Sequence, residues 1–117
     1  MHTKDQLGIN GENYAVRYLI GAGFTIVTRN WRCPDGEIDI LAADGPTLAV
    51  IEVKTRATDA FGQPYEAVNW RKSARLRRLA AQWLREHPWP GPVRFDVISI
   101  VMPKDVVPTL QHIRAAF

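Results

Sequence analysis

The chain has 117 residues, 46% of them hydrophobic and 23% charged, which is enough apolar material for one core without disulfides or a structural metal. Its single cysteine, Cys33, excludes an internal disulfide, and we see neither a membrane-spanning apolar run nor a secretion signal, so we expect one cytoplasmic domain over residues 1–117. The net charge of +3 is a weak indication of an anionic partner.

The N-terminal segment predicts a helix. Thr3 and Gln6 have the spacing of an N-terminal capping box, and apolar or small residues recur after them at helical intervals. Gly21 and Gly23 are expected to end the helix, because glycine readily takes the left-handed conformation that follows a last helical turn.

Three strands are expected to follow, because the next segments alternate in hydropathy or are rich in β-branched residues. They lie at 24–31, 37–43 and 48–56. Residues 44–47, between the second and third strands, have strong turn chemistry. The second and third strands should therefore form an antiparallel hairpin.

A second helix is predicted over residues 66–86, where one apolar stripe recurs at helical spacing. The stripe consists of Leu76, Leu79, Ala80, Trp83 and Leu84. Three prolines between 87 and 92 must end this helix, a strand follows at 94–101, and residues 110–113 are expected to form a short last strand. The fold class is α/β.

The predicted hairpin carries acidic residues within apolar strands. A turn at 44–47 sets the pairing so that Asp39 faces Glu52 and Glu37 faces Lys54. Because strand side chains alternate between faces, these four residues share one face with Leu41 and Val50. The residues expected to point the other way, into the core, are Ile38, Ile40, Ile51 and Val53.

Opposed carboxylates repel each other, so Asp39 and Glu52 need a positive partner. Lys54 is close, but one ammonium cannot neutralise the three acids Asp39, Glu52 and Glu37. A divalent cation could, because Mg²⁺ takes one or two carboxylates and keeps waters for a phosphate substrate. Pattern alone leaves two interpretations open: a metal site beside a lysine, and a solvated strand face with ion pairs such as Glu37 with Lys54.

Asp39 with Glu52-x-Lys54 on the next strand resembles the catalytic signature of the PD-(D/E)xK nuclease superfamily, and the element order is similar to its αβββαβ core. A closer resemblance, over nearly the whole chain, is to the YraN-like family, bacterial proteins that resemble archaeal Holliday-junction resolvases. The matching residues are Gly11-Glu12, Arg29-Asn30-Trp31-Arg32, Gly36-Glu37-Ile38-Asp39, Glu52-Val53-Lys54-x-Arg56, Phe61-Gly62-x-Pro64 with Glu66-Ala67-Val68, Phe95-Asp96-Val97 and His112-Ile113-x-x-Ala116-Phe117. The resemblance implies a restriction-endonuclease-like fold, with a mixed sheet flanked by helices.

The resemblance also implies a metal-dependent phosphodiesterase that acts on DNA, including branched or damaged DNA. Asp39 and Glu52 would bind Mg²⁺ or Mn²⁺, with the backbone carbonyl of Val53 as a further ligand. Lys54 would orient the attacking water and stabilise the charge that develops on the phosphate. Pro34-Asp35 also spells the first letters of the superfamily's name, but Asp39 is the position that matches.

Two further acids belong to this set. Glu12 matches a helix acid that lies beside the metal site in the resolvase relatives, so the resemblance counts it among the catalytic residues; an exposed helix glutamate is the alternative. Glu37 is expected to orient Lys54.

One segment supplies the basic character of the chain. Residues 71–85 hold six basic residues and no acidic one, whereas the rest of the chain holds nine basic and twelve acidic residues. Beside a phosphodiesterase site such a helix would hold a nucleic-acid backbone through phosphate contacts; a solvated amphipathic helix is the alternative. The residues expected to contact nucleic acid are Arg56, Arg71, Lys72, Arg75 and Arg78.

Two functions stay open. One is a Mg²⁺-dependent nuclease, and the other is a non-catalytic or weakly active nucleic-acid-binding module on the same fold. The complete set of Asp39, Glu52 and Lys54 favours the nuclease, because a binding module has no need for acids that face phosphate. A membrane partner is not expected, and both a monomer and a homodimer remain open.

Overall fold

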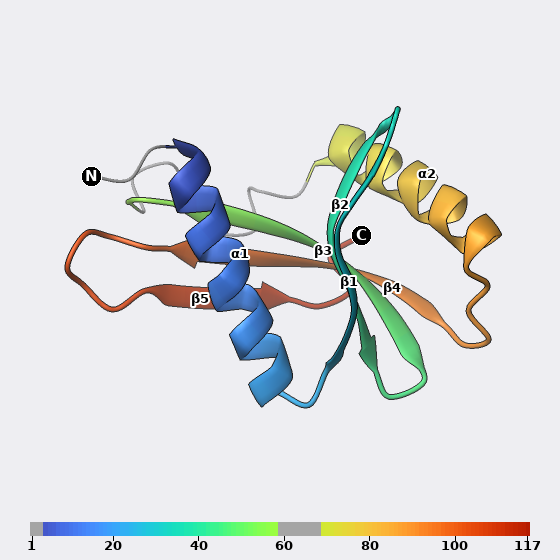
Figure 1. Ribbon diagram of the computed structural model, residues 1–117, viewed down its shortest axis with the longest axis horizontal. Helices are drawn as coiled ribbons and strands as arrows, with labels where there is room; N and C mark the ends of the chain where they lie inside the picture. The colour runs from blue at the N-terminus through green and yellow to red at the C-terminus, as the bar shows by residue number, and fades with distance from the viewer. Residues whose placement is uncertain (1–3, 59–68) are drawn as a thin grey trace.

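The computed structural model describes residues 4–58 and 69–117 (Figure 1). Its elements follow the expected order, and each strand begins and ends within two residues of its predicted bounds. They are α1 (Lys4–Gly21), β1 (Thr25–Cys33), β2 (Gly36–Asp44), β3 (Thr47–Arg56), α2 (Trp70–Glu86), β4 (Val93–Val101) and β5 (Thr109–Ile113). Thr3 and the motif at 61–68 lie outside the described residues.

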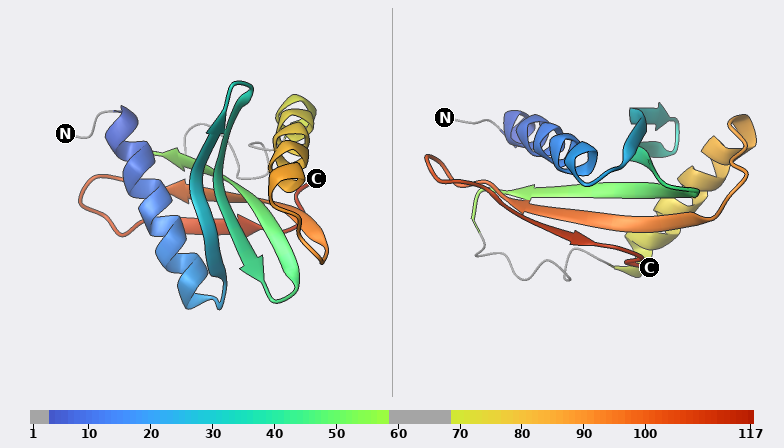
Figure 2. Two further views of the ribbon diagram at one scale, coloured as in Figure 1. Left: turned by 45° about the vertical axis from the view of Figure 1, so that its right-hand side comes forward. Right: turned by 90° about the horizontal axis from the view of Figure 1, so that it is seen from below.

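The five strands form one mixed sheet in the order β1-β2-β3-β4-β5. Only β3 and β4 pair in parallel, and α2 provides the crossover that a parallel pair requires. Helix α1 covers one face of the sheet and α2 packs against the other (Figure 2). This arrangement is compatible with a restriction-endonuclease-like core, so the predicted fold class is confirmed. Neither described helix is long and apolar enough to cross a membrane.

The hairpin of β2 and β3 has the predicted pairing where the two strands are in contact. Asp44 pairs with Thr47 across the turn, and the register continues without a slip to Ile40 and Ile51. Gly45, with φ of 58°, lies in the left-handed region that favours glycine, which explains why the turn falls there.

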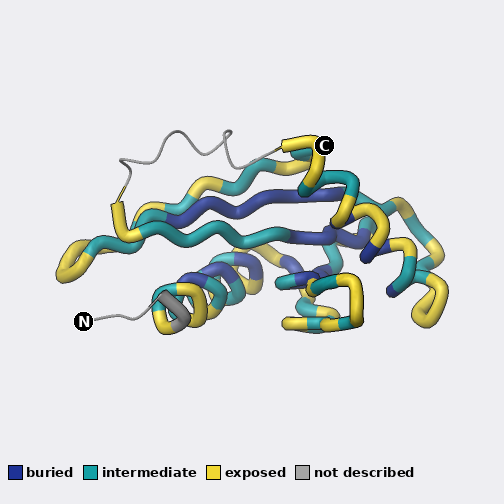
Figure 3. The backbone as a smooth tube through the Cα atoms, turned by 90° about the horizontal axis from the view of Figure 1, so that it is seen from above, coloured by how far each residue is buried: buried dark blue, intermediate teal, exposed yellow. Residues whose placement is uncertain are grey.

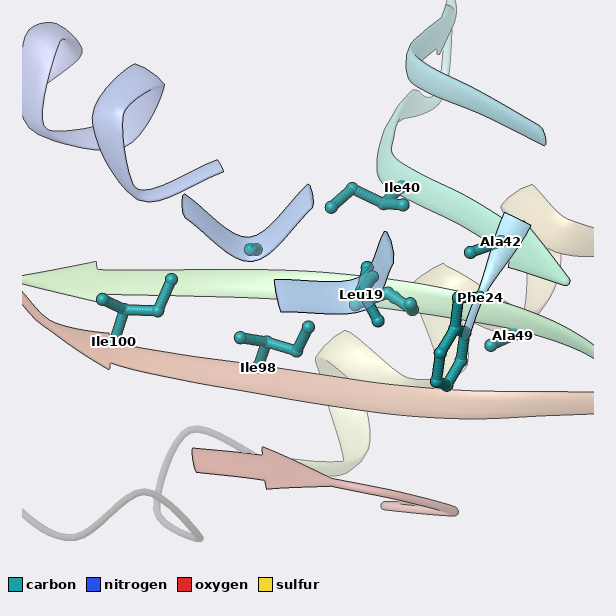
Figure 4. Packing of buried hydrophobic residues seen from close by; sticks show 9 residues of the cluster. Leu19, Phe24, Ile40, Ala42, Ala49, Ile98 and Ile100 are labelled. Atoms are coloured by element: carbon teal, nitrogen blue, oxygen red, sulfur yellow. The ribbon is translucent and has the colours of Figure 1, made fainter. Parts of the chain in front are cut away.

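Both faces of this hairpin are packed. The α1-side core is a cluster of nine buried residues: Ala15, Leu19, Phe24, Ile40, Ala42, Ala49, Ile51, Ile98 and Ile100 (Figure 4). The α2-side core consists of Ile38, Leu41, Leu48, Val50, Leu76, Leu79, Ala80, Trp83 and Phe95. Ile38 and Ile40 are both buried in the core, as expected, but they do not pack on the same side of the sheet: Ile40 belongs to the α1-side core and Ile38 to the α2-side core. The interpretation of the Leu41 and Val50 face as solvated is wrong, since α2 covers it.

The strands separate beyond this paired region. The pairing of β2 with β3 ends at Ile40 and Ile51, while β2 continues paired with β1 as far as Cys33 and Gly36. The far end of the β1–β2 hairpin therefore rises from the sheet between the two helices (Figures 1 and 2). The burial of β3 changes at the same place: its residues are buried from Leu48 to Ile51 and only half-buried from Glu52 onward (Figure 3). We call this place the branch point.

Helix α2 begins later than predicted. Asn69 is extended, with φ of −145° and ψ of 157°, and its side chain accepts the backbone N–H of Lys72. An asparagine in this conformation is a favourable N-cap. The helix therefore begins at Trp70, and its predicted start at residue 66 lies outside the described residues.

Candidate active site

Asp39 lies at the branch point. Its Oδ2 accepts the backbone N–H of Val53 at 2.8 Å, so the carboxylate replaces the strand partner that β3 loses there. The N–H and C=O of one strand residue point to the same edge, which places the Val53 carbonyl on the edge of β3 that faces Asp39. Its role as a metal ligand stays a prediction.

The surroundings of Asp39 oppose its ionisation. Burial, and to a smaller extent the negative charges of Glu52, Glu37 and Glu12, together raise the pKa of Asp39 from 3.8 to about 6, against the hydrogen bond from Val53, which lowers it. Burial and like charges both oppose ionisation of a carboxyl group. A half-buried acid with this kind of shift, in a hollow, is a candidate functional group.

Glu52 and Lys54, both on β3, lie beside Asp39 of β2, and Lys72 reaches the same place from α2. The Lys72 Nζ lies 4.0 Å from Glu52 Oε1, and both side chains are mostly buried, with 28% and 18% of their surfaces exposed. Burial lowers the pKa of Lys72, and a close contact with the Lys54 ammonium lowers it further. Two acids and two lysines from three elements therefore meet at the branch point.

Glu12 reaches the same region from α1. The helix can approach β3 closely because Gly11 has no side chain: a Cβ there would overlap the side chain of Thr55. The Glu12 side chain is only 14% exposed, with its Oε1 3.5 Å from Arg29 Nε. That oxygen is buried and accepts no hydrogen bond within the described residues. Glu12 is therefore not an exposed helix glutamate.

Two hollows adjoin Asp39, one toward each helix. The α2-side hollow, of about 560 Å³, includes the side chains of Glu52, Lys72 and Arg75. The α1-side hollow, of about 660 Å³, includes Glu12, Lys54 and Arg56. Three residues line both hollows: Arg32, Glu37 and Asp39. Asp39 is thus reachable from both sides of the raised hairpin.

Glu37 does not have its predicted partner. It pairs with Arg32 on β1 and accepts a hydrogen bond from Arg32 Nε at 2.8 Å. The prediction that Glu37 faces Lys54 and orients it is wrong, because β2 has already left β3 before it reaches Glu37. Asp35, set aside in favour of Asp39, is exposed in the turn of the raised hairpin.

The predicted nucleic-acid-binding residues divide into two groups. Lys72, Arg75 and Arg56 line the hollows around Asp39. Arg71 and Arg78 are exposed on the outer side of α2, and the Arg71 guanidinium lies 5.4 Å from the ring centroid of Trp70. The sequence prediction did not distinguish Lys72 from the outer arginines, but its position one turn before the buried Leu76 indicates that it faces the sheet.

The donor set fits a hard cation that keeps most of its waters. Within residues 4–58 and 69–117, no three His, Cys, Asp or Glu side chains form a group that could hold an ion by themselves. Asp39 and Glu52 offer two carboxylates, and Mg²⁺ commonly uses one or two together with waters and substrate oxygens. The raised pKa of Asp39, which has no ion-pair partner within the described residues, and the buried Glu12 oxygen that accepts no hydrogen bond there are both consistent with a bound cation.

A second polar cluster is centred on Asp96 of β4, which pairs with Ile51 of β3, and it has a different character. Asp96 is fully buried, and its carboxylate accepts hydrogen bonds from Arg94 at 2.8 and 3.0 Å and from the Ala115 N–H at 3.1 Å. The His112 Nε2–H donates to Asp96 at 2.7 Å, which leaves His112 Nδ1 to accept from the Tyr18 hydroxyl at 2.8 Å. This cluster joins α1, β4, β5 and the residues that follow β5.

Hydrogen bonding decides the ionisation of Asp96. Burial by itself would raise the pKa of Asp96, but the bonds from His112, Arg94 and Ala115 outweigh it and lower the pKa to about 2. Asp96 and His112 belong to the motifs that carry the family resemblance. Their donors and acceptors are used within the fold, so we assign them a structural role.

Comparison with known proteins agrees with these motifs. The profile of the family described as "Uncharacterised protein family UPF0102" matches residues 11–100. The chain belongs to this family. UPF0102 is the YraN family, which is related to the PD-(D/E)xK nucleases, so the resemblance drawn from the motifs is confirmed.

Full-length relatives carry the same family name. A UPF0102 protein of Paenarthrobacter aurescens is 51% identical over 97% of this chain and 95% of its own length. The UPF0102 protein of Beutenbergia cavernae is 50% identical over 97% and 98%, and that of Frankia alni is 49% identical over 100% and 98%. The similarity therefore includes both helices and all five strands.

Proposed function

We propose that this protein is a metal-dependent endonuclease that hydrolyses phosphodiester bonds in DNA, including branched or damaged DNA. The observation that carries the proposal is the half-buried Asp39, whose pKa is raised by burial and by three neighbouring acids, in hollows that also contain Lys54 and Lys72. Within the described residues Asp39 has no ion-pair partner, whereas the structural acid Asp96 is paired with Arg94 and His112.

The side chains at the branch point have complementary tasks. Asp39 and Glu52 hold Mg²⁺ or Mn²⁺, and the bound ion supplies a more acidic water and neutralises charge on the phosphate. The Val53 N–H orients the Asp39 carboxylate. Lys54 positions the water and donates to the phosphate oxygens as negative charge develops on them.

The basic residues place the substrate. Arg56 and Arg75 lie in the two hollows that flank Asp39, so each can hold a phosphate on its own side of the cut bond. Arg71 and Arg78 on the outer side of α2 add contacts that do not depend on base sequence. The mostly apolar packing of α2 on the sheet leaves these charges directed away from the core.

Cleavage and metal binding test the proposal together. Branched, single-stranded and duplex DNA would be incubated with Mg²⁺ or Mn²⁺, and Mn²⁺ affinity would be measured by calorimetry. We expect Lys54→Ala to lower the cleavage rate by about 10²–10³ and to keep metal affinity, because the lysine acts on the transition state. Glu52→Ala should lose both, because a ligand is removed.

Glu86→Ala is the matched control, since it removes one exposed acid from the far end of α2. It should change neither cleavage nor Mn²⁺ affinity. If the unmodified protein cleaves none of the DNAs while the Lys54 and Glu52 variants bind DNA as it does, the protein is a binding module and the nuclease proposal fails.

A further inference from the structure

Two ammonium groups meet beside Glu52. Lys54 is two residues from Glu52 on β3 and therefore shares its face, while Lys72, from the first turn of α2, places its Nζ 4.0 Å from Glu52 Oε1, so the two lysine side chains come into contact there. An ammonium group has three donors and no acceptor, so two charged lysines repel each other and cannot bond directly. Their approach is favourable only when an anion accepts from both.

Glu52 meets this need only in part. Its Oε1 lies 4.0 Å from Lys72 Nζ, which is longer than a hydrogen bond. The positive charge of Arg75 also acts on Lys72, so two cationic side chains, Lys54 and Arg75, act on Lys72 against the single carboxylate of Glu52. The hollow of about 560 Å³ that contains Glu52, Lys72 and Arg75 leaves room for a second anion.

We propose that Lys54 and Lys72 form one phosphate-binding pair, which holds the non-bridging oxygens of the phosphodiester that is cut. This makes Lys72 a second catalytic lysine, supplied by α2 and not by the strand motif. The inference rests on the proposed nuclease function. A phosphodiester suits the pair, because its two non-bridging oxygens share one negative charge and can each accept from one ammonium.

The start of α2 holds Lys72 in place for this task. Asn69 Oδ1 accepts the Lys72 N–H at 3.0 Å, and the Ser73 hydroxyl donates to the Asn69 carbonyl at 2.7 Å. One turn later Leu76 is buried in the α2-side core. A charged group that is fixed before the substrate binds costs little reorganisation in the reaction.

Single-turnover cleavage of single-stranded DNA with Mn²⁺ tests the catalytic role. We expect Lys72→Ala to lower the maximal rate by about 10²–10³, and Lys72→Arg, which keeps the charge, to recover part of the loss. Mn²⁺ affinity without DNA should not weaken, because no ligand is removed. Arg85→Ala is the control, since it removes one exposed charge from the last turn of the same helix. A defect of Lys72→Ala that is confined to KM, or that equals the Arg85 variant, would overturn the proposal.

Binding without metal tests the shared phosphate. The affinity for a short single-stranded DNA in EDTA would be measured for Lys54→Ala, Lys72→Ala and the double variant. If the two lysines share a phosphate, the fold-loss of DNA affinity in the double variant should differ by about threefold or more from the product of the fold-losses in the two single variants. A double variant whose fold-loss equals that product would mean that the lysines bind separate phosphates and would reject the pair. This result stands even if the unmodified protein cleaves no DNA, an outcome that would reject the nuclease function instead.

Discussion

Asp39 and Asp96 lie in neighbouring parts of one sheet, and their surroundings are opposite. Asp96 is fully buried and accepts four hydrogen bonds, three of them from the side chains of Arg94 and His112. Within the described residues Asp39 accepts one, from a backbone N–H, and it has three other acids nearby. The pKa of Asp96 is accordingly lowered to about 2, whereas that of Asp39 is raised to about 6.

The difference separates a structural acid from a functional one. The charge of Asp96 is compensated within the fold, so it stabilises the folded state. The charge of Asp39 is compensated only when something else binds, so it costs stability until then. Residues at functional sites commonly lower the stability of the folded protein in this way. The same substitution at the two positions should therefore act in opposite directions.

Asp96→Asn should have the largest effect. It removes the negative charge but leaves Arg94 and His112 with their donors directed at an amide. Breaking a buried ion pair from one side typically costs about 3–5 kcal/mol. The free energy of unfolding from denaturant titration measures this. Asp35→Asn, in an exposed turn, is the control and should stay within about 0.5 kcal/mol of the unmodified protein; an equally small change for Asp96 would refute its structural role.

Asp39→Asn should stabilise the protein, by about 1–2 kcal/mol at pH 7 without metal. The amide oxygen can still accept the Val53 N–H, while the uncompensated charge disappears. Because the pKa of Asp39 is higher in the folded protein than its ordinary value of 3.8, the folded state holds more protons between about pH 4 and pH 6. Its contribution to stability therefore falls as the pH rises through that range.

The pH profile of stability distinguishes the two aspartates. In the Asp39→Asn variant the decline between about pH 4 and pH 6 should disappear. The same variant should still lose stability in acid, because the stabilisation that Asp96 provides is present above about pH 4 and disappears as the pH falls toward 2. If both variants show the same profile as the unmodified protein, the contrast between the two acids is wrong.

Tyr18→Phe should have the smallest effect. It removes the hydroxyl that donates to His112 Nδ1 and leaves that nitrogen without its partner. One neutral hydrogen bond contributes about 0.5–1.5 kcal/mol, which thermal or denaturant unfolding can detect. Tyr14→Phe, on the same helix, removes a hydroxyl with no hydrogen bond to the described residues and should change the unfolding free energy less. Equal effects would mean that the Tyr18 hydroxyl does not support the Asp96 cluster.

Local pattern was sufficient for the elements and for the register of the main hairpin. The turn chemistry at 44–47 placed Ile40 opposite Ile51, as the structure shows, because a hairpin register follows directly from its turn. The same argument failed at Glu37, and although Ile38 is buried as predicted, it did not show that Ile38 packs on the α2 side. Register propagates only while two strands remain paired, and a strand's own residues do not show where it leaves its neighbour.

The amino-acid sequence by itself determined the order of elements, the turn, the apolar stripe of α2 and the family, because these depend on neighbours along the chain. The tertiary structure alone decided which charged groups meet. It brought Glu12 from α1 and Lys72 from α2 to the branch point, and it gave Asp96 its partners from β5 and the residues beyond. The reason is that burial and Coulomb interactions depend on distances in space. Two aspartates that look alike in the sequence thus acquire pKa values about four units apart.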